Sequence, residues 1–100
     1  MNTACCDFDA FLKAMADETR RRILALLQER ELSVSELTEC FSVTQPTISH
    51  YLAILRHVNL VRSRREGRQR FYRASPACVT ECCGEMLTRF SDGSDLEGSD

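Results

Sequence analysis

The stretch from residue 44 to residue 74 most constrains the fold, because it joins a capped amphipathic helix directly to a β-hairpin. Thr44 can cap a helix with Pro46 in its first turn, where the missing proline N–H has no helical partner to lose. Apolar residues then recur at i, i+3, i+4 and i+7, the spacing of a helix face that packs on a core. These residues are Ile48, Tyr51, Leu52 and Leu55. Two runs of strand-forming residues follow, on either side of a turn at Glu66-Gly67.

Helix signals also precede and follow this stretch. Apolar spacing predicts a first helix over 8–15, and Asp17 can cap a second helix over 18–30. Ser33 and Glu36 form a capping-box pattern that opens a short third helix, and a last helix is expected over 76–90. This order predicts a mainly α, winged helix-turn-helix domain over residues 1–90, with the sequence α-α-α-α-β-β-α. The acidic, Gly- and Ser-rich residues 91–100 are expected to form a disordered tail.

Length and composition limit the class of protein. One hundred residues can bury one modest core. No apolar run approaches the ~18 residues of a membrane span, and the N-terminus MNTACCDFD lacks the features of a signal peptide. The protein is therefore expected in the cytoplasm. In that reducing compartment, its six cysteines are expected to be metal ligands or redox-active thiols rather than a disulfide framework.

The net charge of −2 conceals a basic segment. Residues 56–73 contain seven arginines, no lysine and one glutamate, which gives +6, whereas the first 55 residues carry −3. Arginine favours phosphate binding, because its planar guanidinium can donate two hydrogen bonds to one phosphate. A solvated charged hairpin is the alternative, but the asymmetry predicts a polyanion-binding surface. With the DNA-reading elements described next, the expected partner is double-stranded operator DNA.

Two elements carry the candidate DNA contacts. In a helix-turn-helix the second helix enters the major groove, and its N-terminal residues meet base edges. The apolar stripe of the helix after Thr44 leaves short polar side chains pointing outward, and the hairpin supplies arginines for phosphates or the minor groove. The candidates are Thr44, Gln45, Thr47, Ser49 and His50 on the helix, and Arg64, Arg65, Gly67 and Arg68 on the hairpin.

The chain resembles the ArsR/SmtB family of metal-responsive bacterial repressors over residues 8–75. The resemblance lies in the segments LKAMADETRRRILALL, TQPTISHYLAILRHVNLV and REGRQRFYRA. It implies a homodimer, formed through the first and last helices, that represses transcription from a palindromic operator and releases the DNA when a metal or metalloid binds. Ser42 stands where the family's turn usually has glycine. Because a left-handed serine costs on the order of 1 kcal/mol, the turn is expected to differ slightly.

The family's usual metal sites are missing from this sequence. Many arsenic-responsive members have three cysteines at the start of the third helix, where this chain has Ser33, Ser35 and Thr38. Zinc-responsive relatives use carboxylates and histidines on the last helix, whereas the histidines here, His50 and His57, lie on or just after the recognition helix. The clustered thiols remain as candidate metal ligands. They are the N-terminal pair, Cys5 and Cys6, together with Cys78, Cys82 and Cys83.

Sulfur donors select soft ions, so the expected inducer is arsenite or a similar thiophilic ion such as antimonite, cadmium, lead or mercury. Trivalent arsenic needs three thiolates. At 3.6 residues per turn, Cys78 and Cys82 lie about 40° apart on one helix face, but Cys83 lies about 100° from Cys82. The third thiolate could come from the N-terminal pair, with the first helix of one subunit packed near the last helix of its partner. Alternatively, the helix loosens at Gly84 and Cys83 joins.

Three other functions are compatible with parts of this sequence. A redox sensor of the same fold would oxidise Cys82, Cys83 or the N-terminal pair. A thiol-rich metal-buffering or protein-interaction module would use the arginines to bind an acidic partner. The spacing of five residues between Cys83 and Arg89 matches the loops of phosphatases and arsenate reductases. An enzyme is not expected, because such a loop cradles an oxyanion with backbone N–H groups, whereas this segment is predicted to be an amphipathic helix. Cys40, on an apolar helix face, is expected to fill the core.

Overall fold

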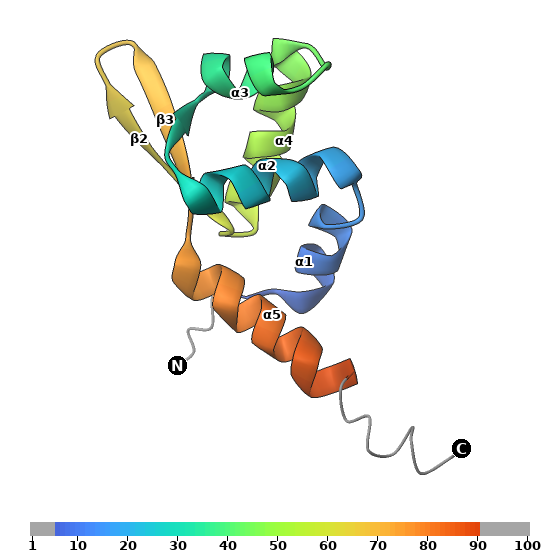
Figure 1. The fold of residues 1–100 in the computed structure, drawn as a ribbon. Coiled ribbons are helices and arrows are strands. Elements are labelled where there is room, and N and C mark those ends of the chain that lie inside the picture. The colour runs from blue at the N-terminus through green and yellow to red at the C-terminus, as the bar shows by residue number, and fades with distance from the viewer. Residues whose placement is uncertain (1–5, 91–100) are drawn as a thin grey trace.

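The computed structural model describes residues 6–90 and folds them into five helices and a three-stranded antiparallel sheet (Figure 1). The helices are α1 (Phe8–Ala14), α2 (Glu18–Glu29), α3 (Val34–Cys40), α4 (Gln45–His57) and α5 (Pro76–Phe90). The strands are β1 (Leu32–Ser33), β2 (Val61–Glu66) and β3 (Gln69–Ala74). This order confirms the predicted winged helix-turn-helix, with α3 and α4 as the helix pair and β2 and β3 as the wing. The acidic tail and Cys5 lie outside the described residues.

The predicted helix caps are present. The Asp17 carboxylate accepts a hydrogen bond from the Arg20 amide at 2.9 Å and begins α2. Ser33 and Glu36 form the capping box of α3: the Ser33 hydroxyl accepts from the Glu36 amide at 3.1 Å, and the Glu36 carboxylate accepts from the Ser33 amide at 2.8 Å. The Thr44 hydroxyl caps α4. Each cap satisfies backbone donors that the first turn of a helix leaves unpaired.

One hydrophobic core lies between α2, α3, α4 and the base of the wing. The stripe predicted for α4 is confirmed, because Ile48, Leu52 and Leu55 are fully buried and Tyr51 is half-buried. Fully buried partners from the other elements are Ile23, Leu27, Leu37 and Leu60. Burial of one face of α4 determines which of its residues face outward, and so positions the recognition surface.

The sheet has the strand order β1-β3-β2 and connects the wing to the helix pair. Leu32 pairs with Tyr72 and Ser33 pairs with Phe71, so the strand β1 lies along the outer edge of β3. The sequence did not predict β1, because a two-residue strand has no periodicity of its own and leads straight into α3. Through this pairing the wing is attached to the residue that caps α3.

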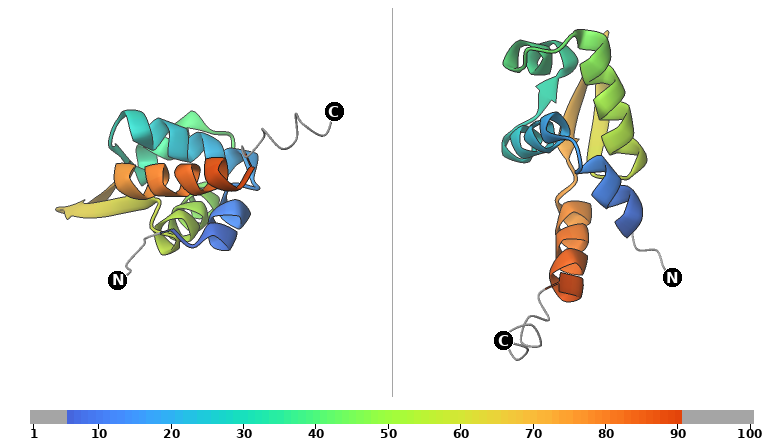
Figure 2. Two further views of the ribbon diagram at one scale, coloured as in Figure 1. Left: turned by 90° about the horizontal axis from the view of Figure 1, so that it is seen from below. Right: turned by 90° about the vertical axis from the view of Figure 1, so that its right-hand side faces the viewer.

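The last helix extends away from the helix-turn-helix and has α1 against its side (Figures 1 and 2). It buries Cys78, Val79 and Cys82. Leu87 and Phe90 are each 63 % exposed. The Phe90 ring lies beside Phe8, the first residue of α1, and the two ring centroids are 6.3 Å apart. In the described part of the chain, no helix has the length and apolar character needed to span a membrane.

Two details of the helix pair differ from expectation. Cys40 is exposed, so its predicted role in the core is wrong: α3 ends at this residue, and Leu37 is the side chain that faces the core. Within residues 6–90, the non-glycine residue with a positive φ is Asn59, at 65°. Ser42, which stands where the family's turn usually has glycine, therefore does not adopt the left-handed conformation. The turn between α3 and α4 avoids the strain that this conformation would impose on a serine.

Candidate nucleic-acid interface and thiol site

The N-terminal half of α4 presents a polar outer face. Thr44 and Thr47 lie with their hydroxyl oxygens 3.1 Å apart, and the Thr44 hydroxyl also accepts from the Thr47 amide at 3.4 Å. These two residues form the helix cap. Gln45, Ser49 and His50 are exposed beside it and can reach base edges if this helix enters the major groove.

The tip of the wing presents exposed arginines. Gly67 has a φ of 64°, the left-handed region that glycine occupies at little cost, and it closes the turn between β2 and β3. Arg65 and Arg68 flank this turn and are exposed. Within the described residues, neither side chain makes an ion pair or a hydrogen bond, so both guanidinium groups can bind phosphates.

Arg64 has a different environment from its neighbours. Its Nε and Nη2 donate to the two carboxylate oxygens of Glu31 at 2.8 Å each, and its Nη1 donates to Glu66 at 2.9 Å. These hydrogen bonds from Arg64 hold the pKa of the Glu31 carboxyl below its ordinary value. Arg64, a predicted DNA contact, therefore uses these hydrogen-bond donors on carboxylates of the protein itself.

The recognition helix and the wing lie on one face of the molecule. A cleft of about 230 Å³ separates them and is lined by Gln45 at the start of α4 and by Arg68 and Arg70 of the wing. Residues 33–35, at the start of α3, form its other wall. Of the predicted contacts, this cleft brings together Gln45 of the helix and Arg68 of the wing. Figure 1 shows the wing and the start of α4 at the same end of the molecule.

The thiols of the two chain ends also meet. Cys6, just before α1, forms a disulfide with Cys82 of α5, and their Cα atoms are 5.4 Å apart. Cys82 is 1 % exposed, and Cys78, one turn earlier in α5, is also buried. Cys83 is exposed and is not part of a disulfide. The predicted geometry is confirmed, since Cys78 and Cys82 share a helix face that Cys83 does not share.

The meeting of Cys6 and Cys82 takes place within one chain, whereas one of the expected arrangements used the last helix of the partner. Among residues 6–90, no group of three or more Cys, His, Asp or Glu side chains is arranged to hold a metal ion. Cys5, the other member of the N-terminal pair, falls outside the described residues. The structure thus joins Cys6 to Cys82 close to α1, and Cys78, buried one turn before Cys82 in α5, is itself disulfide-bonded.

Known proteins share both the sequence and the fold. The family described as "Bacterial regulatory protein, arsR family" matches residues 17–63, from the cap of α2 into β2. The transcriptional repressor SdpR of Bacillus subtilis is 31 % identical over 81 residues, which cover 81 % of this chain and 90 % of that protein. This chain belongs to the arsR family.

Further relatives agree with this assignment. The arsenic resistance transcriptional regulator ArsR1 of Pseudomonas putida is 43 % identical over 65 residues, covering 64 % of this ArsR-family chain and 51 % of that protein. A crystal structure of a possible transcriptional regulator for arsenical resistance superposes with a TM-score of 0.77 and 31 % identity, over 89 % of this chain and 93 % of that one. The protein is therefore an ArsR-family DNA-binding transcriptional regulator and not an enzyme.

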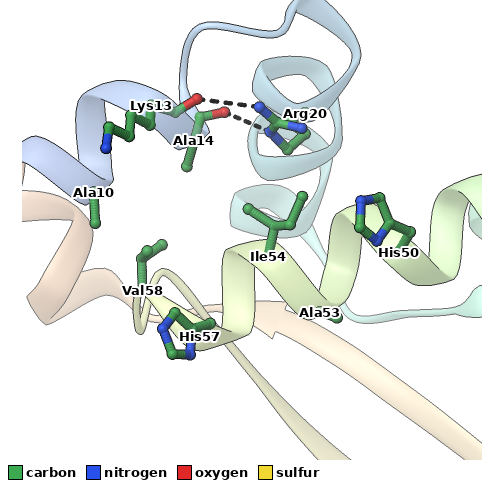
Figure 3. A pocket seen from close by; sticks show the side chains of 9 residues that line it. All are labelled: Ala10, Lys13, Ala14, Arg20, His50, Ala53, Ile54, His57 and Val58. Carbon is green, nitrogen blue, oxygen red and sulfur yellow. Dashed lines mark hydrogen bonds between the residues drawn. The ribbon is translucent and has the colours of Figure 1, made fainter.

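In this ArsR-family regulator, α1 faces the recognition helix across a cavity of about 420 Å³ (Figure 3). Side chains of Ala10 and Ala14 from α1, of Ile54 from α4 and of Val58 just after α4 line it. The remaining lining residues are Lys13, Arg20, His50, Ala53 and His57. The small alanine side chains of α1 leave this space open.

The C-terminal end of α1, which also lines this cavity, is held by α2. Arg20 of α2 donates from Nε to the Ala14 carbonyl at 2.7 Å and from Nη2 to the Lys13 carbonyl at 3.1 Å (Figure 3). Cys6 lies one residue before Asp7, the N-cap of α1. The helix α1 therefore connects the thiol pair to the surroundings of the recognition helix. Sequence reasoning missed both Arg20 and Glu31, because their partners lie on other elements and no local pattern marks them.

Proposed function

We propose that this regulator is a homodimeric repressor that binds operator DNA in the cytoplasm and releases it when arsenite or a similar thiophilic ion binds its cysteines. The observation that carries the proposal is the meeting of Cys6 and Cys82, which links the start of α1 to the buried face of α5. Thiolates prefer soft ions over calcium, magnesium or manganese, so antimonite, cadmium, lead and mercury are the other candidate inducers.

In the reduced protein, a trivalent arsenic centre would draw on three thiolates that residues 6–90 do not hold grouped as an ion site, so binding would need these side chains to move together. Cys6 and Cys82 supply two, and Cys78 is the favoured third because it is buried on the same face of α5. Cys5 and Cys83 are the alternative third ligands. Arsenous acid would form three As–S bonds with three thiols; its three hydroxyl groups and the three thiol protons leave as three water molecules. No oxidant or reductant is required.

Ion binding would reach the DNA-binding surface through α1. The ligand Cys6 adjoins the cap of this helix, and the helix faces α4 across the cavity of Figure 3. If the ion prefers a position of α1 that fits DNA poorly, then the ion and the operator each lower the affinity for the other by the same factor.

A second copy of the chain is the expected partner. Leu12 of α1 and Leu87 and Phe90 of α5 are exposed apolar side chains on the two helices that the thiols connect. Burial of such a surface against the same surface of another copy favours a symmetric dimer. Ion binding at the thiols could then change the spacing of the two recognition helices.

The relatives support parts of this proposal. SdpR is named as a transcriptional repressor, and the Pseudomonas putida protein is named as a regulator of arsenic resistance. The alignment with the second of these covers only 51 % of that protein's length. The choice of ion therefore rests on the thiols of this chain.

A redox sensor is the second candidate, and the disulfide is the observation that favours it. A hydroperoxide could oxidise the two thiols: the Cys6 and Cys82 sulfurs form one S–S bond, and the peroxide is reduced to water and an alcohol, or to two water molecules if it is hydrogen peroxide. The disulfide would hold α1 against α5 as the ion would, so oxidation alone would release DNA.

One experiment separates these candidates. A DNA duplex is first selected from a random-sequence library by the protein reduced with a phosphine, since dithiol reductants compete for arsenite. Fluorescence anisotropy then follows release of this duplex on addition of arsenite under anaerobic conditions, or of hydrogen peroxide alone. Release by arsenite and not by peroxide supports the ion-responsive repressor, whereas release by peroxide alone supports the redox sensor. Failure to enrich any sequence would contradict operator binding and favour the metal-buffering or interaction module.

A further inference from the structure

Arg64 lies midway along β2, an edge strand of the three-stranded sheet. It pairs with Phe71 of β3, and Phe71 pairs on its other side with Ser33 of β1. The three residues thus form a row that crosses the whole sheet, from the outer strand of the wing to the strand that precedes α3. The Arg64 guanidinium lies over the Phe71 ring, with its central carbon 5.0 Å from the ring centroid.

The guanidinium continues along this row to the far edge of the sheet. There it donates two parallel hydrogen bonds of 2.8 Å to Glu31, the residue before β1, and a third of 2.9 Å to Glu66 of its own strand. A bidentate arginine–carboxylate pair fixes orientation as well as distance. Because Nε, Nη1 and Nη2 of Arg64 all donate to these carboxylates, a phosphate would have to displace them to bind the same guanidinium.

The contact connects two elements that must be aligned on DNA. Glu31 and β1 lead directly into α3, whose first turn is capped by Ser33. Arg64 belongs to β2, which leads to the wing tip. Arg65 of the same strand and Arg68 of the following turn lie at this tip. Holding Glu31 therefore sets the direction of the wing relative to the helix pair, and so relative to the cleft between Gln45 and Arg68.

We propose that Arg64 and Glu31 are a positioning pair for DNA binding: Arg64 holds the wing in register with the recognition helix instead of neutralising a phosphate. The pair is a clamp across the sheet, and its role does not depend on which inducer the thiols bind. Its effect belongs to the DNA complex rather than to folding, because exposed ion pairs contribute little to the stability of a domain.

For the change in DNA affinity of a Glu31 variant, the clamp predicts the opposite sign from simple electrostatics. Glu31→Gln removes a negative charge near the wing, and a charge effect alone would strengthen binding to the DNA polyanion. The clamp predicts the opposite, an affinity about threefold to fivefold weaker for the selected duplex, as expected for losing an exposed pair of good geometry. Arg64→Gln should weaken binding by a similar factor.

The salt dependence separates positioning from phosphate contact. The logarithm of affinity for the selected duplex is measured against the logarithm of salt concentration for the reduced, ion-free protein. Arg68→Gln, the matched control on the same wing, should reduce the slope by about 0.9, the value for one lost phosphate contact. Arg64→Gln should leave the slope unchanged. The double variant Glu31→Arg with Arg64→Glu, which reverses the pair at constant net charge, should recover most of the lost affinity.

Two results would overturn the clamp. One is unchanged or tighter binding by Glu31→Gln, and the other is a slope that falls by about one unit in Arg64→Gln. Thermal unfolding of each variant, compared with the unmodified protein, confirms that the measured change arises in the complex. Arsenite is absent from all of these measurements, so their outcome is independent of the proposed inducer.

Discussion

Adjacent residues of the same type have different environments in this protein. Cys82 is buried and bonded to Cys6, whereas Cys83 is exposed and not part of a disulfide. Arg64 is held by two carboxylates, whereas Arg65 next to it is not. Residue type alone therefore does not assign a role, and each variant has to be chosen from the position of its side chain.

The outward residues of α4 should carry sequence specificity. Ser49→Ala or His50→Ala should cost about 1–3 kcal/mol on the selected duplex and much less on random DNA, because a lost base-edge hydrogen bond matters only for the correct base. Arg68→Ala should weaken binding to both duplexes equally, since phosphates carry no sequence information. Anisotropy titrations of both duplexes measure this difference. Equal losses on the two duplexes for the α4 variants would show that another element reads the bases.

The elements differ in how far the sequence predicts them. The caps of α2, α3 and α4 and the wing turn at Gly67 depend on neighbouring residues, so local patterns locate them correctly. The strand β1 and the bond between Cys6 and Cys82 depend on pairing with segments far along the chain; for the two cysteines the separation is 76 residues. Local patterns carry no information on such partners. The sequence wrongly assigns Cys40 to the core: α3 ends at this residue, and its side chain is exposed.

The capping box of α3 should contribute measurably to stability. Ser33→Ala leaves the Glu36 amide without its side-chain acceptor and should lower the free energy of unfolding by about 1 kcal/mol. For a domain of this size, that change corresponds to a decrease in melting temperature of roughly 4–8 °C. Circular dichroism at fixed protein concentration measures it, with Ser35→Ala, exposed in the same helix, as the control. Equal melting temperatures for the two variants would contradict a stabilising cap.

At the scale of the whole molecule, charge is distributed unevenly along the chain. Residues 56–73 carry +6, and residues 91–100 carry four carboxylates and no basic residue. The wing, on the face shared with the recognition helix, holds six of the seven arginines of the basic segment. Long-range attraction to DNA is therefore opposed by acidic segments elsewhere in the chain, and both effects weaken as salt screens them.

Removal of the acidic tail tests this opposition. Truncation after Phe90 removes four carboxylates and no residue of the described core, so folding and dimerisation should be retained. Affinity for DNA should rise slightly at low salt and should be unchanged at about 0.5 M salt, where the Debye length is only a few Å. Anisotropy titrations at the two salt concentrations provide the comparison. A large decrease in melting temperature would show instead that the tail contributes to folding.

The most direct test of the account is release of the selected duplex by arsenite from the Cys6→Ser/Cys82→Ser variant. Both side chains keep nearly the same size and lose their soft donor, and neither lies on the face formed by the recognition helix and the wing. Cys40→Ser, an exposed cysteine outside the thiol pair, is the matched control. All proteins are reduced and should bind the duplex equally before arsenite is added. The account predicts that arsenite releases the unmodified protein and the control but leaves the double variant bound. Release of the double variant at the same arsenite concentration would contradict it.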